Sequence, residues 1–379
     1  MRPSRSGPKE KAAVPLSDQI HQIRQHLSGL SDPAVDSGLM LAAGRHRLAS
    51  IVERALFERC ALAGDASILI GCSGGPDSSA LSVLIAALAG RRDSSLRAPV
   101  LVHVDHGLRP GGSIEAEGVS RLAARLGLGF RGVSLGMDPL QADLAGSARR
   151  LRYDALHDVA CELRYSCVAC AHHAEDRFET IIHGLCRGVG VEALSNPTWQ
   201  RSLGSVSLLR PLLDVSREDL RDFCCSLEID FFDDPTNVDP ATMRGSLRNS
   251  VLPRLEERWP GASRRASAAI DRISVASDSL DREISGILKH ASSDSIDLSL
   301  LVINQTGFIS ALIRRWILTY AETQGHDLRD HLSSSFFDQV ARAVCDKETK
   351  PRLFHCAGLL TVRLDVHSLV IGPMFSGES

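Results

Sequence analysis

The chain has 379 residues, of which 44% are hydrophobic and 23% charged, and its formal net charge is −3 at pH 7. This length is enough for two or three domains with packed cores. No apolar run approaches the ~18 residues of a membrane span, and the net charge argues against a uniformly basic surface. The ten cysteines come without a secretion signal, so a disulfide framework has little support. We expect a cytoplasmic protein without a membrane partner.

Residues 1–48 are interpreted as an N-terminal extension that is disordered in part. Their first stretch is rich in Ser, Pro, Arg and Lys, and Pro3, Pro8 and Pro15 interrupt any amphipathic helix. A secretory signal would need a continuous apolar segment, which this stretch lacks.

Short apolar runs alternate with helical periods from about residue 51 to 213, a pattern typical of a parallel sheet covered by helices. We therefore expect an α/β domain over residues 49–247, built on a doubly wound, mostly parallel sheet. The predicted strands are 67–72, 100–104, 129–134, 166–171 and 206–209. The predicted helices are 78–89, 113–126, 140–162 and 174–186.

The first predicted strand runs into a glycine-rich turn, Ser73-Gly74-Gly75-Pro76-Asp77-Ser78-Ser79, which opens directly into a helix. Gly74 and Gly75 allow the backbone to approach an anion, and the first N–H groups of a helix point at its oxygens. The serines add hydroxyl donors, and the Asp77 carboxylate suits Mg²⁺ on a polyphosphate. The turn lacks the Gly-Lys-Ser/Thr of a Walker A loop. Its order resembles the loop of enzymes that cleave ATP between the α and β phosphates, although an ordinary turn between strand and helix is the alternative.

The second predicted strand ends in Val102-His103-Val104-Asp105-His106-Gly107-Leu108-Arg109, at the same edge of the sheet. Ligands of doubly wound folds bind at this edge. His103, Asp105 and His106 are therefore candidates for contacts with a nucleotide. The alternative is that Asp105 and His106 only cap the next segment.

The fourth predicted strand runs into Ala171-His172-His173-Ala174-Glu175-Asp176. A helix that begins near His173 would place His172, Asp176 and either Glu179 or Thr180 along one face. A histidine and a carboxylate one turn apart can position Mg²⁺ or move a proton beside a triphosphate. Zinc is the competing interpretation, but His-Glu-x-x-His is absent.

The remainder of the chain differs in character. Residues 244–272 hold seven arginines and three acids, a local charge of +4, which can track a phosphate backbone although a solvated helix face is the commoner meaning. We interpret 248–379 as a helical domain. Apolar and polar residues alternate over 351–373, which predicts a small terminal hairpin.

The order and spacing of these segments from 68 to 255 resemble the tRNA(Ile)-lysidine synthases. The shared segments are the Ser-Gly-Gly-x-Asp-Ser loop, the stretch from His103 to Arg109, residues 148–153, Ala-His-His-x-x-Asp, the Arg-Gly-x-Gly turn at Arg187, Leu-Arg-Pro-Leu-Leu and the stretch from Asp234 to Leu255. Departures from the usual pattern are Glu175, Arg177, Gly245 and the Gly146-Ser147 pair.

The resemblance implies a ligase that forms a carbon–nitrogen bond with the help of ATP and Mg²⁺. ATP adenylates the C2 oxygen of the wobble cytidine in a CAU-anticodon tRNA(Ile) and releases pyrophosphate, and free L-lysine then attacks C2 and displaces AMP to give lysidine. The implied catalytic residues are Asp77, His172, Asp176 and Arg244, with Asp77 and Asp176 as Mg²⁺ ligands. The implied ATP contacts are residues 73–79 (Ser73, Gly74, Gly75, Pro76, Asp77, Ser78 and Ser79) with His103, Asp105 and His106. The implied tRNA contacts are Arg109, Arg187, Arg244 and Arg248.

Three alternatives remain at this point. A sulfur-inserting tRNA enzyme would use Cys167 and Cys170, but side chains three apart on a strand point to opposite faces. A small-molecule ligase would not need the arginine-rich extension. A degenerate tRNA-binding protein would not need the intact loop. The sequence does not fix the oligomeric state, and a homodimer is one option.

Overall fold

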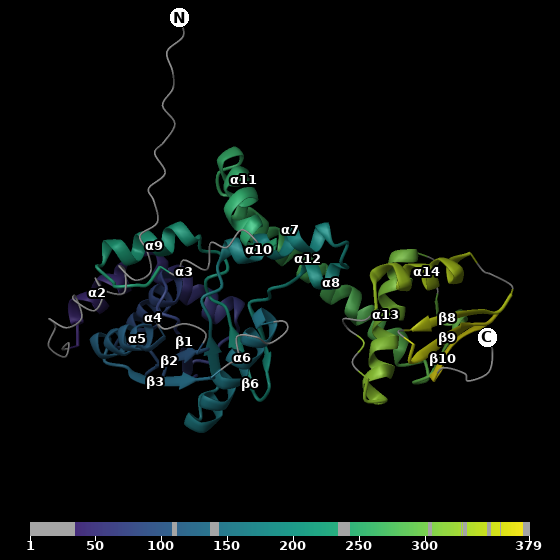
Figure 1. The fold of residues 1–379 in the computed structure, drawn as a ribbon, viewed down its shortest axis with the longest axis horizontal. Coiled ribbons are helices and arrows are strands. Elements are labelled where there is room, and N and C mark those ends of the chain that lie inside the picture. Colours follow the sequence, from purple (N-terminus) through teal and green to yellow (C-terminus); the bar gives the residue numbers. More distant parts are fainter. Residues whose placement is uncertain are drawn as a thin grey trace, which may run out of the picture. The chain divides into compact units, whose positions relative to one another are not determined.

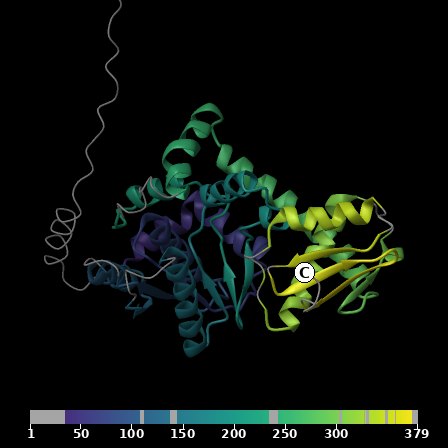
Figure 2. The same cartoon turned by 45° about the vertical axis from the view of Figure 1, so that its right-hand side comes forward.

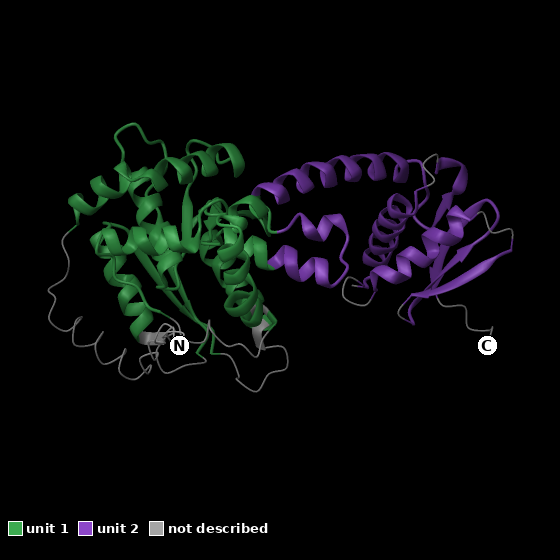
Figure 3. Cartoon of the chain, turned by 90° about the horizontal axis from the view of Figure 1, so that it is seen from above, with its two compact units in different colours: residues 1–179, 197–267 green, residues 180–196, 268–379 purple. Residues whose placement is uncertain are grey.

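The computed structural model describes residues 35–107, 112–136, 144–233, 243–301, 305–326, 328, 332–346, 350–356 and 358–373. The chain divides into two compact units, Met1–Glu179 with Pro197–Ser267, and Thr180–Asn196 with Ala268–Ser379 (Figure 3). The division differs from the boundary expected at residue 248. Helix α12 (Ala262–Leu288) is continuous across it, and its first turns belong to the first unit.

The first unit is built on a six-stranded sheet in the order β3-β2-β1-β4-β6-β5 (Figure 1). Its strands are β1 (Ile68–Gly71), β2 (Val100–Asp105), β3 (Gly129–Ser134), β4 (Cys167–Ala169), β5 (Gln200–Leu203) and β6 (Val206–Leu209). All neighbouring pairs are parallel except β5 with β6. The predicted doubly wound, mostly parallel sheet is confirmed. Strand β5 was not predicted, because three of its four residues are exposed and give no apolar run.

Helices of the first unit pack around this sheet, whereas α11 projects away from it (Figures 1 and 2). They are α2 (Ser37–Arg45), α3 (Arg47–Arg54), α4 (Pro76–Ala89), α5 (Gly112–Arg125), α6 (Leu144–Leu163), α7 (Ala174–Cys186), α9 (Arg217–Ser226), α10 (Met243–Ser246) and α11 (Leu252–Arg258), with the first turns of α12. Helix α7 continues beyond Glu179 into the second unit. Helices α2 and α3 pack against the buried helix α4, so residues 35–48 belong to the folded unit rather than to an extension.

The topology fixes where a ligand would bind. Strand β1 pairs with β2 on one side and with β4 on the other, so the strand order reverses between β1 and β4. In a doubly wound fold the crevice lies outside the carboxyl ends of the strands at this reversal. The glycine-rich turn follows β1, and the paired histidines follow β4.

Among the described residues of the first unit, two five-residue segments are wound as π-helices. They are η1 (Ala55–Arg59), which continues α3, and η3 (Leu247–Val251), which lies between α10 and α11. Such segments often accompany functional sites. Arg248 lies in η3.

The second unit joins helices to an antiparallel sheet in the order β7-β10-β9-β8. Its elements are α8 (Val191–Leu194), the remainder of α12, β7 (Ser295–Asp297), η4 (Leu298–Leu300), α13 (Thr306–Thr323), α14 (Ser334–Cys345), β8 (Arg352–Cys356), β9 (Leu360–Leu364) and β10 (Ser368–Pro373). The predicted terminal β element is confirmed, and it is larger than a hairpin. Within the described residues, no helix has the length and apolar character needed to cross a membrane.

Candidate active site

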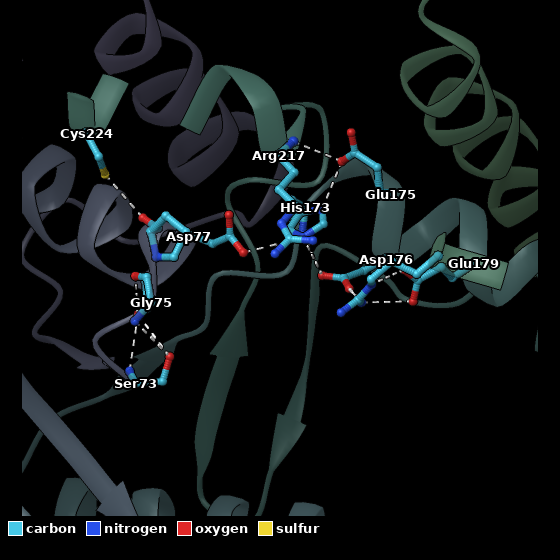
Figure 4. A network of polar contacts seen from close by, with 12 residues as sticks. Ser73, Gly75, Asp77, His173, Glu175, Asp176, Glu179, Arg217 and Cys224 are labelled. Carbon is cyan, nitrogen blue, oxygen red and sulfur yellow. Dashed lines mark hydrogen bonds and ion pairs between the residues drawn. The ribbon is translucent and has the colours of Figure 1, made fainter. Parts of the chain in front are cut away.

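Hydrogen bonds between residues of the turn after β1 fix its shape (Figure 4). Gly74 has φ +85°, a conformation that favours glycine. The Ser73 N–H donates to Ser78 Oγ at 3.2 Å, and Ser78 Oγ donates to the Gly75 carbonyl at 3.0 Å. Gly75 is the N-cap of α4 and Pro76 follows at the first helical position, so the helix starts directly under the turn.

Phe232 covers this turn from the segment after α9. Its N–H donates to the Gly74 carbonyl at 2.9 Å. A Cβ atom on Gly74 would lie 2.9 Å from Phe232 Cδ2, and one on Gly118 of α5 would lie 2.4 Å from Phe232 Cε2. Two glycines therefore make room for one aromatic ring against the glycine-rich turn.

We expect Gly74→Ala to lower the free energy of unfolding by about 2 kcal/mol, because alanine is strained at positive φ and its Cβ meets Phe232. Gly75→Ala is the matched control. Gly75 has φ −73°, and its added Cβ would come no closer than 3.6 Å to any atom beyond its two chain neighbours, so we expect a smaller loss, below about 1 kcal/mol, from the less favourable N-cap. Urea unfolding of both variants tests this difference, and equal losses would contradict it.

His173 lies at the centre of three carboxylates (Figure 4). Its Nδ1 is 2.9 Å from Glu175 Oε2, and its Nε2 is 3.6 Å from both Asp77 Oδ2 and Asp176 Oδ2. The backbone N–H of His173 also donates to Asp176 Oδ2 at 3.0 Å, which fixes the start of α7. Asp77 on α4 and Asp176 on α7 thus approach the same ring nitrogen from either side of the strand-order reversal.

Burial and charge act in opposite directions on these groups. Burial by itself would lower the pKa of His173, but Asp176, Glu175 and Asp77 outweigh it and raise the pKa to about 9. Burial would raise the pKa of Asp176, but the two histidines, the His173 N–H and Arg248 lower it to about 2. For Asp77 burial prevails over His173 and Arg217, and its pKa is raised. At neutral pH His173 is therefore an imidazolium between carboxylates.

Arg248 closes the other side of this group. Its Nε donates to Glu179 Oε1 at 2.7 Å, and its Nη2 donates to Glu179 Oε2 at 3.0 Å and to Asp176 Oδ1 at 3.3 Å. The Glu179 side chain is only 4% exposed. The sequence interpretation gave Arg248 to the RNA surface, and the structure instead places its guanidinium on two carboxylates of α7. A contact between Arg248 and RNA stays a prediction.

His172 points elsewhere than His173. Its Nε2 is 3.5 Å from Arg149 Nη2 and 3.5 Å from the Tyr153 hydroxyl, both on α6. Burial lowers the pKa of His172 to about 3, with Arg210, Arg149 and Arg152 adding to the effect against Asp176. His172 is therefore neutral. A catalytic role of His172 stays a prediction. The structure adds His173, which faces Asp77 and Asp176, and Glu175, which faces His173, and the sequence interpretation assigned neither to the site.

The remaining predicted residues are distributed as follows. His103 is buried on β2 with its Nδ1 3.0 Å from the Cys72 carbonyl, and burial lowers its pKa. Asp105 ends β2 and accepts from the Gly107 N–H at 2.8 Å, with His106 beside it. Arg187 is exposed and belongs to the second unit. Arg109 and the side chain of Arg244 lie outside the described residues.

Several buried polar atoms in this region have no hydrogen-bond partner among the described residues. They are Asp77 Oδ1, Ser79 Oγ and His103 Nε2, on α4 and β2. Buried polar atoms are normally satisfied, so these atoms fit a bound polar ligand. No group of three or more His, Cys, Asp or Glu in the described ranges is arranged to hold a metal. The pair of Asp77 and Asp176 fits Mg²⁺, which commonly takes one or two carboxylates together with phosphates and waters.

Comparison with known proteins gives the family. A family profile described as the PP-loop domain matches residues 46–255, which is more than half of the chain. The chain belongs to the PP-loop family. PP-loop domains bind ATP, and the expected resemblance is confirmed at family level. We refer to residues 73–79, the glycine-rich turn after β1, as the PP-loop.

Two relatives of this PP-loop chain are tRNA(Ile)-lysidine synthases. The chain is 36% identical to the one from Alkalilimnicola ehrlichii over 269 residues, covering 69% of this chain and 59% of the relative. It is 38% identical to the one from Salinispora tropica over 195 residues, covering 50% of this chain and 56% of the relative. The chain therefore spans less than two thirds of the length of either relative.

A solved structure has a similar fold. The U34-tRNA thiolase NcsA from Methanococcus maripaludis matches with a TM-score of 0.51 at 16% identity, over 59% of this chain and 76% of that chain. In the PP-loop chain, Cys167 and Cys170 are buried in different hydrophobic clusters. Their side chains therefore lie on opposite faces of the sheet, as the sequence predicts, and do not converge on a common metal site.

Proposed function

We propose that the protein is a tRNA(Ile)-lysidine synthase, which adenylates the C2 oxygen of the wobble cytidine in a CAU-anticodon tRNA(Ile) with release of pyrophosphate and then joins free L-lysine to C2 with release of AMP. The observation that carries the proposal is the meeting of Asp77 of the PP-loop with Asp176 and Glu179 of α7 around His173 and Arg248. The relatives' names support this choice of reaction. A cytoplasmic location belongs to the same proposal, whereas nothing described selects a monomer or a homodimer.

In the first step the residues of the PP-loop would hold the polyphosphate of ATP. The Ser79 hydroxyl and Asp77 Oδ1 are buried atoms available for a ligand, and the start of α4 favours negative charge. His103 Nε2 is available on β2 for the nucleotide. Asp77 and Asp176 would hold Mg²⁺, which neutralises charge on the phosphates when bound. The imidazolium of His173 adds positive charge beside both carboxylates.

In the second step the ε-amine of lysine must be neutral before it attacks. The acidic groups of α4 and α7 provide attraction for the ammonium form and acceptors for its proton. Burial raises the pKa of both Asp77 and Glu179, which makes them stronger bases than exposed carboxylates. We infer that one of these two carboxylates accepts the proton, while the PP-loop retains the nucleotide.

The RNA would be held in part by the arginine-rich segment that follows the site. Trp259, at the end of α11, is 55% exposed, and its backbone is fixed by hydrogen bonds. Arg265 Nη2 donates to the Trp259 carbonyl at 3.2 Å, and Glu256 accepts from the N–H groups of Gly261, Ala262 and Ser263. A rigid turn thus presents an exposed indole among arginines, which is a suitable platform for an unpaired base.

We expect Trp259→Ala to weaken binding of the anticodon stem-loop about tenfold, because stacking of one base is lost. The dependence of log Kd on log salt should stay unchanged, since no charge is removed. Arg258→Gln should lower that slope by about one. Leu41→Ala, which removes another exposed apolar side chain at 56% exposure on α2, is the control. Fluorescence anisotropy at several salt concentrations distinguishes these variants, and unchanged affinity of Trp259→Ala would remove the indole from the RNA surface.

The function is tested by incubating the protein with ATP, radiolabelled L-lysine and CAU-anticodon tRNA(Ile). We expect label in the RNA together with equimolar AMP and pyrophosphate. Methionine tRNA, which shares the CAU anticodon, is the control for selectivity. Formation of a thiolated RNA, or release of AMP without incorporation of lysine, would contradict the proposal.

A further inference from the structure

Arg177 is a buried arginine whose surroundings set it apart from the catalytic groups beside it. It lies on α7 between Asp176 and Glu179, and it is only 1% exposed. Its Nε donates to the Pro197 carbonyl at 3.1 Å. Its Nη1 donates to the Ser267 carbonyl at 3.1 Å and to Ser267 Oγ at 2.8 Å. The guanidinium also stacks on the ring of Trp199, 5.4 Å from its centroid.

The positions of these contacts along the chain are informative. The chain leaves the first unit after Glu179, returns at Pro197 and leaves again after Ser267 (Figure 3). Arg177 precedes the first crossing by two residues. Its hydrogen-bond acceptors are the first residue after the second crossing and the last residue before the third. The guanidinium of Arg177 is therefore bonded, within the first unit, next to all three points where the chain passes between the units.

Each of the joined segments is also fixed to the body of the first unit. The Thr198 carbonyl accepts from Arg210 Nη1 at 2.7 Å, and the Trp199 carbonyl accepts from the Arg210 N–H at 2.9 Å. Ser267 Oγ donates to the Leu213 carbonyl at 2.7 Å. The Arg177 N–H itself bonds the His173 carbonyl at 3.4 Å, at the start of α7. A planar fork of donors suits such a junction, because it can bind several fixed carbonyls at once.

We propose that Arg177 is a positioning residue that pins the three connections between the units and thereby holds Asp176 and Glu179 in place. Helices α7 and α12 both continue into the second unit, so Arg177 lies next to the points where each of them leaves the first unit. By tying α7 to Pro197 and Ser267, Arg177 fixes the backbone that carries Asp176 and Glu179. This role rests on the proposed function only for its effect on catalysis, since the junction itself is independent of the reaction.

The test is hydrogen exchange of the full chain, comparing the wild type with Arg177→Gln. We expect exchange at least about tenfold faster in three separate segments, the start of α7, residues 197–199 and the start of α12, because the loss of a buried charged donor loosens each of them. Exchange in β1 should stay unchanged.

Arg177→Lys should behave like Arg177→Gln, since an ammonium lacks the planar fork. Ser267→Ala, which keeps the backbone acceptor, should give a smaller increase in the same segments. Arg282→Gln, an exposed arginine on α12, is the control.

A kinetic measurement tests the positioning of the carboxylates. In tRNA-dependent ATP–pyrophosphate exchange, Arg177→Gln should lower kcat about tenfold and change the KM for ATP by a smaller factor, because the PP-loop is not touched although Asp176 loses its fixed position. Faster exchange in α7 alone, an even increase that includes β1, or an unaltered kcat would each overturn the proposal. If hydrogen exchange becomes faster in all three segments of Arg177→Gln but the wild-type protein never ligates lysine, the structural role of Arg177 is supported and the proposed function is contradicted.

Discussion

Asp77→Asn is expected to lower the rate of AMP formation about 1,000-fold, because the substitution removes the charge of the PP-loop carboxylate while keeping its shape. Asp77 Oδ2 faces His173 at 3.6 Å, and Oδ1 is buried without a partner in the described parts of the chain. The variant should still bind nucleotide, since the serines and backbone donors of the turn remain. Single-turnover release of AMP from ATP in the presence of tRNA(Ile) measures the loss.

Asp93→Asn is the control for this experiment. Asp93 is an exposed carboxylate in the turn after α4, so its amide variant changes the net charge equally without touching the site. A rate for Asp77→Asn within a few-fold of that control would show that the carboxylate takes no part in the chemistry. Lost nucleotide binding would instead assign Asp77 to the architecture of the loop.

Arg248→Ala is expected to lower the free energy of unfolding by about 3 kcal/mol, because it leaves the Glu179 carboxylate buried without its cation. Adding Glu179→Gln to this variant removes the stranded charge, so the double variant should be more stable than Arg248→Ala alone. Denaturant unfolding of the two single variants, the double variant and the wild type completes the cycle. Arg254→Ala, at an exposed position on α11, should change stability little.

The loss caused by Arg248→Ala should depend on pH. Burial already raises the pKa of Glu179 against the opposing effect of Arg248, and removal of Arg248 raises it further. An acid whose folded-state pKa exceeds its unfolded value costs stability at high pH and nothing once both states are protonated. The penalty should therefore be present at neutral pH and shrink as the pH falls through the raised pKa. A penalty that is constant between pH 7 and pH 4 would contradict the assignment to Glu179.

The sheet could be predicted from the sequence because buried parallel strands leave continuous apolar runs. All five predicted strands are present, and the glycine-rich turn indicated where the ligand site lies. Strand β5 escaped because an exposed edge strand has no such run. The boundary after Ser267 was not predicted, because it lies inside the long helix α12.

The site was only partly predictable. The pair His172-His173 indicates a functional site in the sequence. Which of the two rings faces the PP-loop depends on where α7 begins, and the hydrogen bond from the His173 N–H to Asp176 fixes that start. The pairing of Arg248 with Glu179 joins residues 69 apart in the sequence, and no local pattern indicates it. The same holds for Phe232, whose place is set by the absence of side chains at Gly74 and Gly118.

The π-wound segment η3 has a consequence for how this region tolerates insertions and deletions. A π-turn arises when one extra residue is accommodated in a helix. Because the wider turn absorbs the extra residue, deleting one residue from Leu247–Val251 would restore ordinary winding and leave α10 and α11 close to their present register. The displacement would fall on the turn itself, where Arg248 lies, and its guanidinium would lose its present direction toward Glu179. The approach of Arg248 to Glu179 thus depends on a single surplus amino acid, and chain length in this segment is as constrained as residue identity.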